Sequence, residues 1–182
     1  MLKTNRLNLR PFTDSDLDIL HQLHSNPEVA RTKIDGIQSR EQVQKQLENF
    51  IAHQEKFGYS QLAVFENESL KFVGRAGLTT RTLNQEIGEL TEIRFAFLPE
   101  FWGEGYASEV ARELIRFGFE DLKLEKMSAS SGTTNEKSFR VLTKYGFKFV
   151  KNILPEGYGS ADEIRFYLMT YEDYLNFFNH KK

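Results

Sequence analysis

The feature that most constrains this chain is a glycine-bearing turn between an apolar segment and a long amphipathic one. Residues 93–98 form an apolar, strand-like run, and residues 105–122 carry apolar side chains at helical spacing. Between them, Gly103 and Gly105 permit positive φ and remove the side chains that would keep an anion off the backbone. The first amides of a helix lack intrahelical acceptors and lie at the positive end of its dipole. The turn therefore predicts a phosphate-binding site.

Two nucleotide-binding patterns fit the residues around this turn poorly. A dinucleotide fingerprint would need a third glycine at Ser108 and an acidic residue that ends the next strand, whereas Glu125 would begin that strand. A nucleotide P-loop would need Gly-Lys-Ser/Thr, but Gly105 is followed by Tyr106 and Ala107. A lone Gly-x-Gly is a weak signal, and by itself the turn would be interpreted as an ordinary helix start; the phosphate site depends on the rest of the chain.

The composition argues against several classes of protein. The chain has 182 residues, a formal net charge of −2 and no cysteine. This length suits one domain with a buried core, and the charge argues against nucleic-acid binding. The lack of cysteine rules out disulfides, thiolate metal sites and cysteine nucleophiles. No apolar stretch approaches the ~20 residues that span a membrane, and no signal peptide is recognised before the first strand. We therefore expect a cytoplasmic protein without a membrane anchor.

A metal site is not expected. His21 and His24 lie three residues apart on a predicted helix, a spacing that would suit two metal ligands. No carboxylate stands at ligand spacing in a recognised motif, so both are interpreted as surface histidines.

The predicted elements alternate between strands and helices along the whole chain. Strands are expected at about residues 6–10, 61–65, 71–79, 92–98, 126–130, 147–150 and 164–169. Helices are expected after Thr13, from Ser39 to about Phe57, from about Gly105 to Leu122, from Asn135 to Tyr145, and from Thr170 onward. This order predicts one α/β domain, residues 1–182, with a mixed sheet.

Three stretches together carry a family resemblance. They are residues 4–11 (TNRLNLRP), residues 98–107 (LPEFWGEGYA), and Asn135-x-x-Ser138 followed by Gly146-Phe147. In these stretches the chain resembles the GNAT superfamily of acyl-CoA-dependent N-acyltransferases, and more narrowly the branch that contains the ribosomal-protein N-terminal acetyltransferases RimJ and RimL. The resemblance spans nearly the whole chain. It implies a mixed, mostly antiparallel sheet of about seven strands flanked by helices, with a splay between the fourth and fifth strands.

The resemblance also implies acetyl-CoA as co-substrate, with no metal. The pyrophosphate would lie on the amides of residues 103–107, and the pantetheine arm would pair with the strand at residues 95–98. In the superfamily pattern Q/R-x-x-G-x-G/A, Trp102 replaces the polar first residue. The residues that the resemblance assigns to the cofactor are Phe95, Ala96, Phe97, Leu98, Trp102, Gly103, Glu104, Gly105, Tyr106, Ala107, Asn135 and Ser138.

The chemistry needs a group that accepts a proton from the amine and a group that stabilises the leaving thiolate. Glu92, at a position where this branch often carries a glutamate, is the candidate base, although it also reads as a solvated carboxylate at a strand end. Glu89, Asp162 and Glu163 are rivals for this role. In many GNAT enzymes a tyrosine seven residues after the motif asparagine acts as the general acid toward the thiolate. In this chain that position is occupied by Leu142.

Ser138 therefore becomes the candidate partner of the thiolate, because the ribosomal-protein branch places a serine near the sulfur and a hydroxyl can donate one hydrogen bond to it. Asn135 would fix the pantetheine arm or cap the helix, and one geometry allows both roles.

The acceptor is expected to be an amine. In this fold it would be gripped by residues 27–40 and 154–162, and the carboxylates that would attract it are Glu28, Asp35, Glu156 and Asp162. The branch favours a protein N-terminal α-amine, but a polyamine, aminoglycoside or amino-acid-like molecule stays open. A non-catalytic acyl-CoA-binding module is the rival function, and a nicotinamide-dependent oxidoreductase is disfavoured by Ser108. The chain is expected to be a monomer or a homodimer, in which the aromatic residues of 171–178 pack on the sheet or on a second copy.

Overall fold

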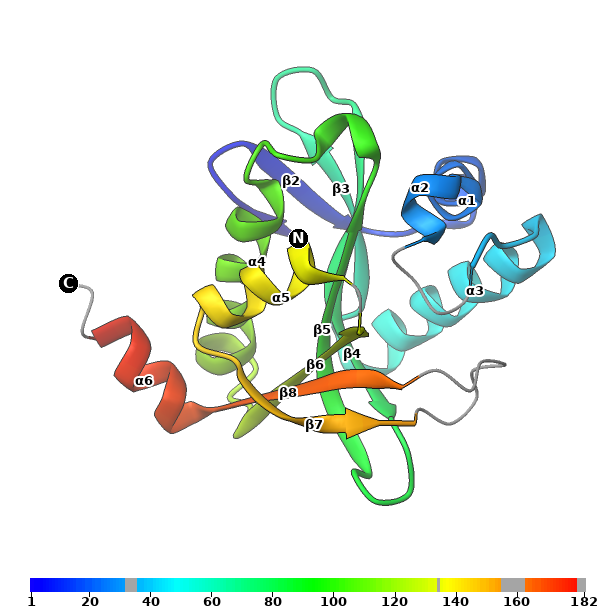
Figure 1. The fold of residues 1–182 in the computed structure, drawn as a ribbon. Coiled ribbons are helices and arrows are strands. Elements are labelled where there is room, and N and C mark those ends of the chain that lie inside the picture. Colours follow the sequence, from blue (N-terminus) through cyan, green and yellow to red (C-terminus); the bar gives the residue numbers. More distant parts are fainter. Residues whose placement is uncertain (32–35, 134, 155–162, 180–182) are drawn as a thin grey trace.

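The computed structural model describes residues 1–31, 36–133, 135–154 and 163–179 (Figure 1). Its strands are β1 (Leu2–Lys3), β2 (Leu7–Pro11), β3 (Gln61–Glu66), β4 (Phe72–Thr82), β5 (Glu89–Phe97), β6 (Lys126–Gly132), β7 (Lys148–Ile153) and β8 (Ile164–Thr170). Its helices are α1 (Leu17–Ser25), α2 (Pro27–Ala30), α3 (Arg40–Phe57), α4 (Tyr106–Arg116), α5 (Glu136–Lys144) and α6 (Tyr171–Asn179). Single 3₁₀ turns cover Asp14–Asp16 and Pro99–Phe101, and a π-helical turn covers Phe117–Asp121.

In the described residues the strands form one sheet in the order β1-β2-β3-β4-β5-β6-β8-β7. Neighbouring strands are antiparallel except β5 and β6, which are parallel and share the single register pair Glu92↔Ser128. Beyond this pair the two strands separate. The predicted mixed sheet with a splay is confirmed, with the two-residue strand β1 as an eighth strand too short for the sequence pattern to reveal.

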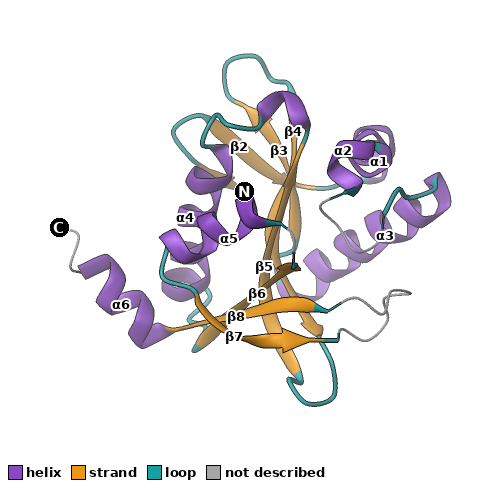
Figure 2. Ribbon diagram, viewed as in Figure 1, coloured by secondary structure: helices purple, strands orange, loops and turns teal. Residues whose placement is uncertain are grey.

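Helices cover both faces of this sheet (Figure 2). Successive residues of β3 face opposite layers, because side chains alternate along a strand. Leu62 and Val64 pack into the large core under α4, whereas Ala63 packs with Leu20 of α1 and Leu47 of α3. The splay between β5 and β6 therefore lies between a layer of α4 and α5 and a layer of α1 to α3.

Two predicted boundaries are wrong, and the first of them affects the surroundings of Glu92. Strand β5 begins at Glu89, three residues before the expected start, because its hairpin with β4 extends to the pair Thr82↔Glu89. The helix expected to run to Leu122 leaves α-helical geometry at Arg116 and continues as the π-helical turn. By contrast, α3 begins at the expected capping box of Ser39 and Gln42.

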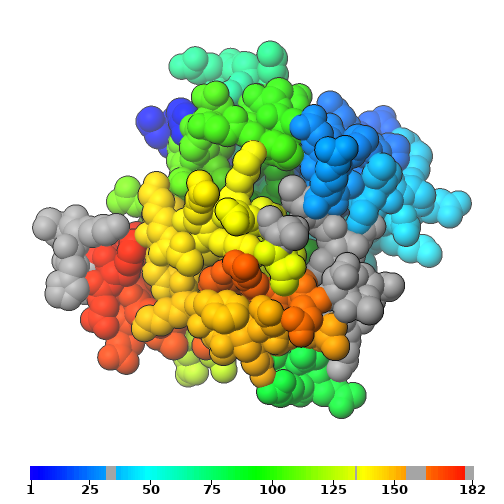
Figure 3. All heavy atoms as spheres, viewed as in Figure 1, coloured from blue at the N-terminus to red at the C-terminus, as the bar shows by residue number. Residues whose placement is uncertain are grey.

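One face of the molecule is formed by α5 (yellow), with the orange-coloured strands below it (Figure 3). The blue segments of α1 to α3 lie on one side of α5 and the red segment of α6 lies on the other. In α6, Tyr174 is buried and stacks on Phe119 of the π-helical turn with ring centroids 5.0 Å apart. Tyr174 shares one core cluster with Met127 and Met169 of the sheet, which agrees with the predicted packing of the aromatic residues on the sheet. Within the described ranges, no helix has both the length and the apolar character to cross a membrane.

Candidate active site

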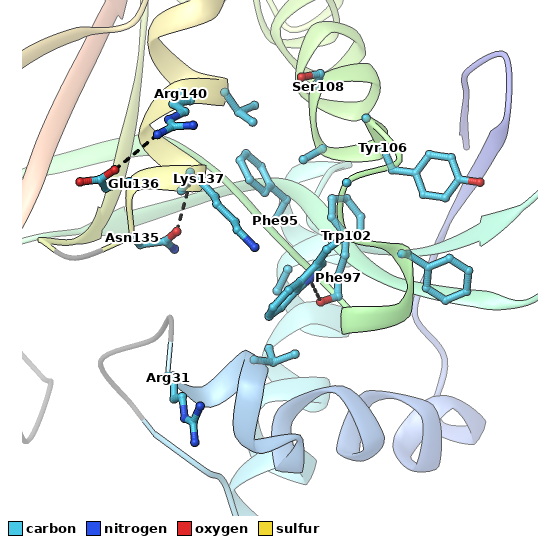
Figure 4. Close-up of a pocket in the computed structure, with 18 residues that line it drawn as sticks. Arg31, Phe95, Phe97, Trp102, Tyr106, Ser108, Asn135, Glu136, Lys137 and Arg140 are labelled. Atoms are coloured by element: carbon cyan, nitrogen blue, oxygen red, sulfur yellow. Dashed lines mark hydrogen bonds and ion pairs between the residues drawn. The ribbon is translucent and has the colours of Figure 1, made fainter.

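A cavity of about 830 Å³ opens where β5 ends and α4 begins (Figure 4). Its walls come from four places in the sequence: the end of β5, the loop and first turn of α4, the first turns of α5, and the end of α2. The lining residues are Val29, Arg31, Phe95, Ala96, Phe97, Phe101, Trp102, Gly103, Gly105, Tyr106, Ala107, Ser108, Asn135, Glu136, Lys137, Ser138, Arg140 and Val141. Most of the residues predicted for the cofactor thus lie around one space.

The loop before α4 has the backbone that its glycines predict. Gly103 and Gly105 have φ of +88° and +79°, in the left-handed region that favours glycine. Gly105 is the N-cap of α4 and gives the helix no side-chain cap. The first helical bond runs from the Glu109 amide to the Gly105 carbonyl at 3.0 Å. The amides that precede Glu109 have no acceptors within the helix and lie at its positive end, beside the cavity.

Trp102 forms a wall of the cavity next to the open edge of β5. Its indole N–H donates to the Phe97 carbonyl at 2.8 Å, whereas the Leu98 amide donates back to Val73 of β4 at 2.9 Å. Peptide groups alternate between the two edges of a strand. The N–H and C=O groups of Phe95 and Phe97 therefore point toward the splay, and of these the Phe97 carbonyl is already engaged by Trp102.

Helix α5 brings a second N-terminus to the cavity. Asn135 is its N-cap, as predicted, and the side-chain Oδ1 accepts from the Ser138 amide at 3.2 Å. Lys137 reaches across toward Trp102, with its Nζ 4.8 Å from the ring centroid (Figure 4). Arg140 lies one turn further on and pairs with Glu136 at 3.6 Å.

The charged side chains around the cavity are mostly positive. Arg31, Lys137 and Arg140 are cationic, and Glu136 is the acidic residue among those that line it. None of these four residues was among those predicted for the cofactor. Lys137 and Arg140, three positions apart after Asn135, were a local signal for positive charge at the start of the predicted helix α5. No local pattern connects Arg31 to the loop that begins at Gly103, much further along the chain.

Glu92 differs from the solvated strand-end carboxylate that was one interpretation of it, because its exposed fraction is 0%. It does not line the cavity. It stands at the register pair where β5 and β6 separate, and accepts a hydrogen bond from the Ser130 hydroxyl across the splay. The Arg81 Nε lies 3.2 Å and the Arg94 Nε 3.8 Å from the Glu92 Oε2.

The other predicted residues lie apart from the cavity. Leu98 is buried against Leu23 and Val29, and the Glu104 carbonyl accepts from Arg6 at 2.9 Å. Glu89 begins β5 as an exposed residue, and Glu163 is exposed and accepts from Asn152 at 3.1 Å. Asp35, Glu156 and Asp162, and with them much of the expected acceptor-binding segments, lie outside the described residues.

The interpretation of His24 as a surface histidine is wrong, because only 2% of the residue is exposed. Its Nδ1 lies 2.7 Å from the Gln38 Oε1, which can only accept, and its Nε2 accepts from the Arg75 Nε at 3.2 Å. The imidazole is therefore neutral and ties α1 to β4. Across the ranges that the structure describes, no group of three or more His, Asp or Glu side chains is arranged to hold a metal ion.

Comparison with known proteins identifies the family. The model of the GNAT acetyltransferase domain matches residues 6–148. The chain belongs to the GNAT acetyltransferase family. The uncharacterized N-acetyltransferase YoaA of Bacillus subtilis is 34% identical over 150 residues, which cover 81% of this chain and 82% of YoaA. The predicted GNAT-type N-acetyltransferase is thereby confirmed.

Solved GNAT structures share the fold. RimL, the ribosomal L7/L12 α-N-protein acetyltransferase in complex with coenzyme A, superposes with a TM-score of 0.74 at 18% identity, covering 92% of this chain and 95% of RimL. The spermidine N-acetyltransferase of Vibrio cholerae, in complex with CoA and spermine, gives a TM-score of 0.72 at 20% identity, covering 93% and 98%. At these identities the likeness establishes the GNAT fold and leaves the acceptor open.

Proposed function

We propose that this GNAT protein transfers the acetyl group of acetyl-CoA to the α-amine of a polypeptide by direct attack in a ternary complex. The observation that carries the proposal is the uncapped N-terminus of α4, which opens through Gly103 and Gly105 onto the cavity beside the free edge of β5. The helix N-terminus would bind an anionic pyrophosphate, and the strand edge would bind an extended arm that carries amide groups.

The charges around the cavity support a cofactor that carries phosphates. The pyrophosphate would accept hydrogen bonds from the amides of residues 103–107. Lys137 and Arg31 add positive charge on opposite walls, and Arg140 lies on the same helix as Lys137, away from Arg31 (Figure 4). A phosphorylated ligand would gain from these side chains even though the whole chain has a net charge of −2.

The open edge of β5 supports the placement of the pantetheine arm. The Phe95 N–H and C=O would pair with its amides as an added strand does, in the gap that β6 leaves. The Phe97 N–H, on the same edge, would then lie near the thioester and hold its oxygen as negative charge develops during attack.

The transfer itself exchanges one bond for another. The uncharged amine nitrogen attacks the thioester carbonyl carbon, a C–N bond forms, the C–S bond breaks, and the sulfur leaves as a thiolate. The Ser138 hydroxyl would donate a hydrogen bond to that sulfur. Counted from the ammonium form, the amine gives up two protons: the first leaves before the attack, to the base and then to solvent, and the second is lost from the attacking nitrogen and ends on the sulfur.

Glu92 is the carboxylate that we assign to accept a proton from the amine. Because it is buried, the proton would reach it by way of Ser130 or a water at the splay. Glu92→Gln should lower kcat/KM for the amine about 100-fold without changing acetyl-CoA affinity. The deficit should shrink above about pH 9, where an α-amine is uncharged by itself. Glu89→Gln, at the exposed start of the same strand, is the matched control, and an undiminished rate in Glu92→Gln would remove this role.

The choice of a peptide α-amine rests on the likeness to the RimJ and RimL branch and on proton chemistry. An α-amine has a pKa of about 7.7–8.0, whereas an alkylamine such as lysine has one of about 10.4. Roughly a tenth of the first is uncharged at neutral pH, but less than a thousandth of the second. An acceptor whose proton leaves easily suits a site whose candidate base is shielded from the cavity.

The first experiment uses the single tryptophan of the chain. Trp102 lines the cavity, so its fluorescence reports occupancy directly. Titrations with acetyl-CoA, NAD and ATP should give a saturable signal with acetyl-CoA alone. Thiol release should then follow the addition of peptides with free N-termini but not of N-blocked peptides. Release with polyamines alone would replace the proposed acceptor, and no binding of acetyl-CoA would overturn the proposal.

A further inference from the structure

Arg6 connects the start of β2 to the loop and first turn of α4. Its Nη1 donates to the Glu104 carbonyl at 2.9 Å, and its Nε and Nη2 both lie 2.7 Å from the Glu109 Oε2. One guanidinium thus holds a backbone group of the loop and a side chain of the helix. These contacts join residues about a hundred positions apart in the sequence.

Glu109 is fixed from two further sides. Its Oε1 accepts from the Thr4 hydroxyl at 2.6 Å and from the Arg6 amide at 2.8 Å. Burial alone would raise the pKa of the Glu109 carboxyl, but the hydrogen bonds from Thr4 and Arg6 together lower it below its ordinary value. The carboxylate is therefore ionised in the neutral range and keeps its grip on Arg6.

Tyr106 supplies a platform for the same guanidinium. The Arg6 Cζ lies 4.4 Å from the centroid of the Tyr106 ring, and the Tyr106 hydroxyl donates to Glu66 of β3. In Figure 4 this ring points away from the cavity, toward the first strands. The first residue of α4 is thus held on its outer side, and its backbone faces the cavity.

The orientation of one peptide unit links these contacts to the cofactor loop. In a trans peptide the carbonyl oxygen and the following N–H point in opposite directions. Because the Glu104 carbonyl is turned toward Arg6, the Gly105 N–H is turned away from Arg6. Gly105 lines the cavity, and the next helical amides follow from it.

We infer that Arg6 is a positioning residue for acetyl-CoA, which sets the direction of the amides that receive the pyrophosphate. This inference rests on the proposed function. The role is geometric, because the charge of Arg6 is already paired with Glu109. Loss of the side chain frees the 104–105 peptide to rotate, so binding has to order the loop again and becomes weaker.

The test compares Arg6→Ala with Arg10→Ala. Arg10 lies on β2, which begins directly after Arg6. It is a close match, because it forms a two-pronged pair with Asp16 at 2.7 and 2.8 Å and stacks over Phe65 at 4.8 Å. Its exposed side-chain fraction is 34%, against 42% for Arg6, and it has no part in the cavity. Each variant loses one ion pair and one ring contact, so a general loss of stability affects both.

Two ligands separate positioning from stability. Acetyl-CoA carries the pyrophosphate, and S-acetyl-pantetheine ends before it. With Trp102 fluorescence as the readout, Arg6→Ala should raise the Kd of acetyl-CoA about 10-fold, a loss of about 1.4 kcal/mol, and leave that of S-acetyl-pantetheine unchanged. Arg10→Ala should change neither. Arg6→Lys has one ammonium group for the two acceptors, so its Kd for acetyl-CoA should lie between those of wild type and Arg6→Ala. This variant can still be measured if the alanine variant fails to fold.

The outcomes of this test distinguish the two proposals. A wild-type protein that does not bind acetyl-CoA would overturn the proposed function together with this inference. Wild-type affinity for acetyl-CoA in Arg6→Ala, or in Arg6→Lys where only that variant folds, would overturn the inference alone. An equal loss for both ligands would also overturn it, because the effect would then not reside at the pyrophosphate.

Discussion

Helices α4 and α5 both begin at the cavity, but their first turns are satisfied in different ways. The N-cap of α5 is Asn135, whose side chain accepts from the Ser138 amide. The N-cap of α4 is Gly105, which has no side chain to offer. An N-cap glycine is less stabilising than an N-cap asparagine by about a few tenths of a kcal/mol, so the open start of α4 costs the fold little.

The two caps determine where the first amides of each helix can direct their hydrogen bonds. The first turn of α5 is completed by its own chain, and so it is suited to hold Ser138 and Lys137 in fixed positions. The first turn of α4 is left to an external acceptor, and its loop is held from behind by Arg6 rather than from within. We expect the anion to bind at α4 and the chemistry to be assisted from α5.

The largest expected effect comes from removing this difference. Gly105→Asp places a carboxylate at the start of α4, where the pyrophosphate is proposed to lie. An added Cβ at Gly105 has one heavy atom within 4 Å, the Arg6 Nη2 at 3.6 Å, so it introduces no clash and brings the carboxylate next to the guanidinium that holds the loop as well as to the proposed phosphate site. The Kd of acetyl-CoA should rise about 100-fold, or about 2.8 kcal/mol, from charge repulsion. Calorimetric titration checks this value.

The control for charge is Gly105→Asn at the same position. Asparagine tolerates positive φ about as well as aspartate and has the same shape, so it keeps the backbone cost and removes the charge. It should weaken binding several-fold less than aspartate does. Equal affinities for the two variants would show that the start of α4 does not face an anion, and the contrast between the helices would then lose its functional meaning.

The next effect concerns the chemistry assisted from α5. Since the Ser138 amide is engaged by Asn135, any contact with the leaving sulfur has to come from the hydroxyl. Ser138→Ala should lower kcat about 10-fold and leave the Kd of acetyl-CoA within about twofold, since a hydrogen bond to a charged group contributes about 1.5 kcal/mol or more. Thr143→Ala removes a hydroxyl from the exposed side of the same helix and serves as control. A kcat equal to that of wild type would exclude Ser138 from the transfer.

The start of α4 could be predicted from the sequence because its cause is local. Two glycines separated by one residue between a strand-like run and a helical pattern permit a backbone that other residues rarely adopt. Asn135 as an N-cap and Gly146 as a helix stop, with φ of +93°, follow from residue preferences of the same kind. Such preferences act within a few residues, so the local sequence is enough to predict these helix ends.

The surroundings of Glu92, His24 and Arg6 could not be predicted in the same way. Glu92 is buried because β5 begins earlier than its apolar pattern indicates and because Ser130 comes from a strand on the far side of the splay. His24 is buried by Arg75 and Gln38, and Arg6 reaches Glu104 across 98 positions. Each depends on which polar groups the completed fold brings together, and no spacing in the chain encodes those pairs.

The smallest effect on binding is expected at the N-cap of α5, where a change should act on stability instead. Asn135→Ala removes the acceptor of the Ser138 amide and should lower the free energy of unfolding by about 1 kcal/mol, measured by urea denaturation. The Kd of acetyl-CoA should change by no more than about threefold. Asn135→Ser keeps a cap oxygen and should recover most of the stability. A tenfold loss of affinity at unchanged stability would mean that Asn135 faces the cofactor as Gly105 does, and that both helix starts serve as ligand sites.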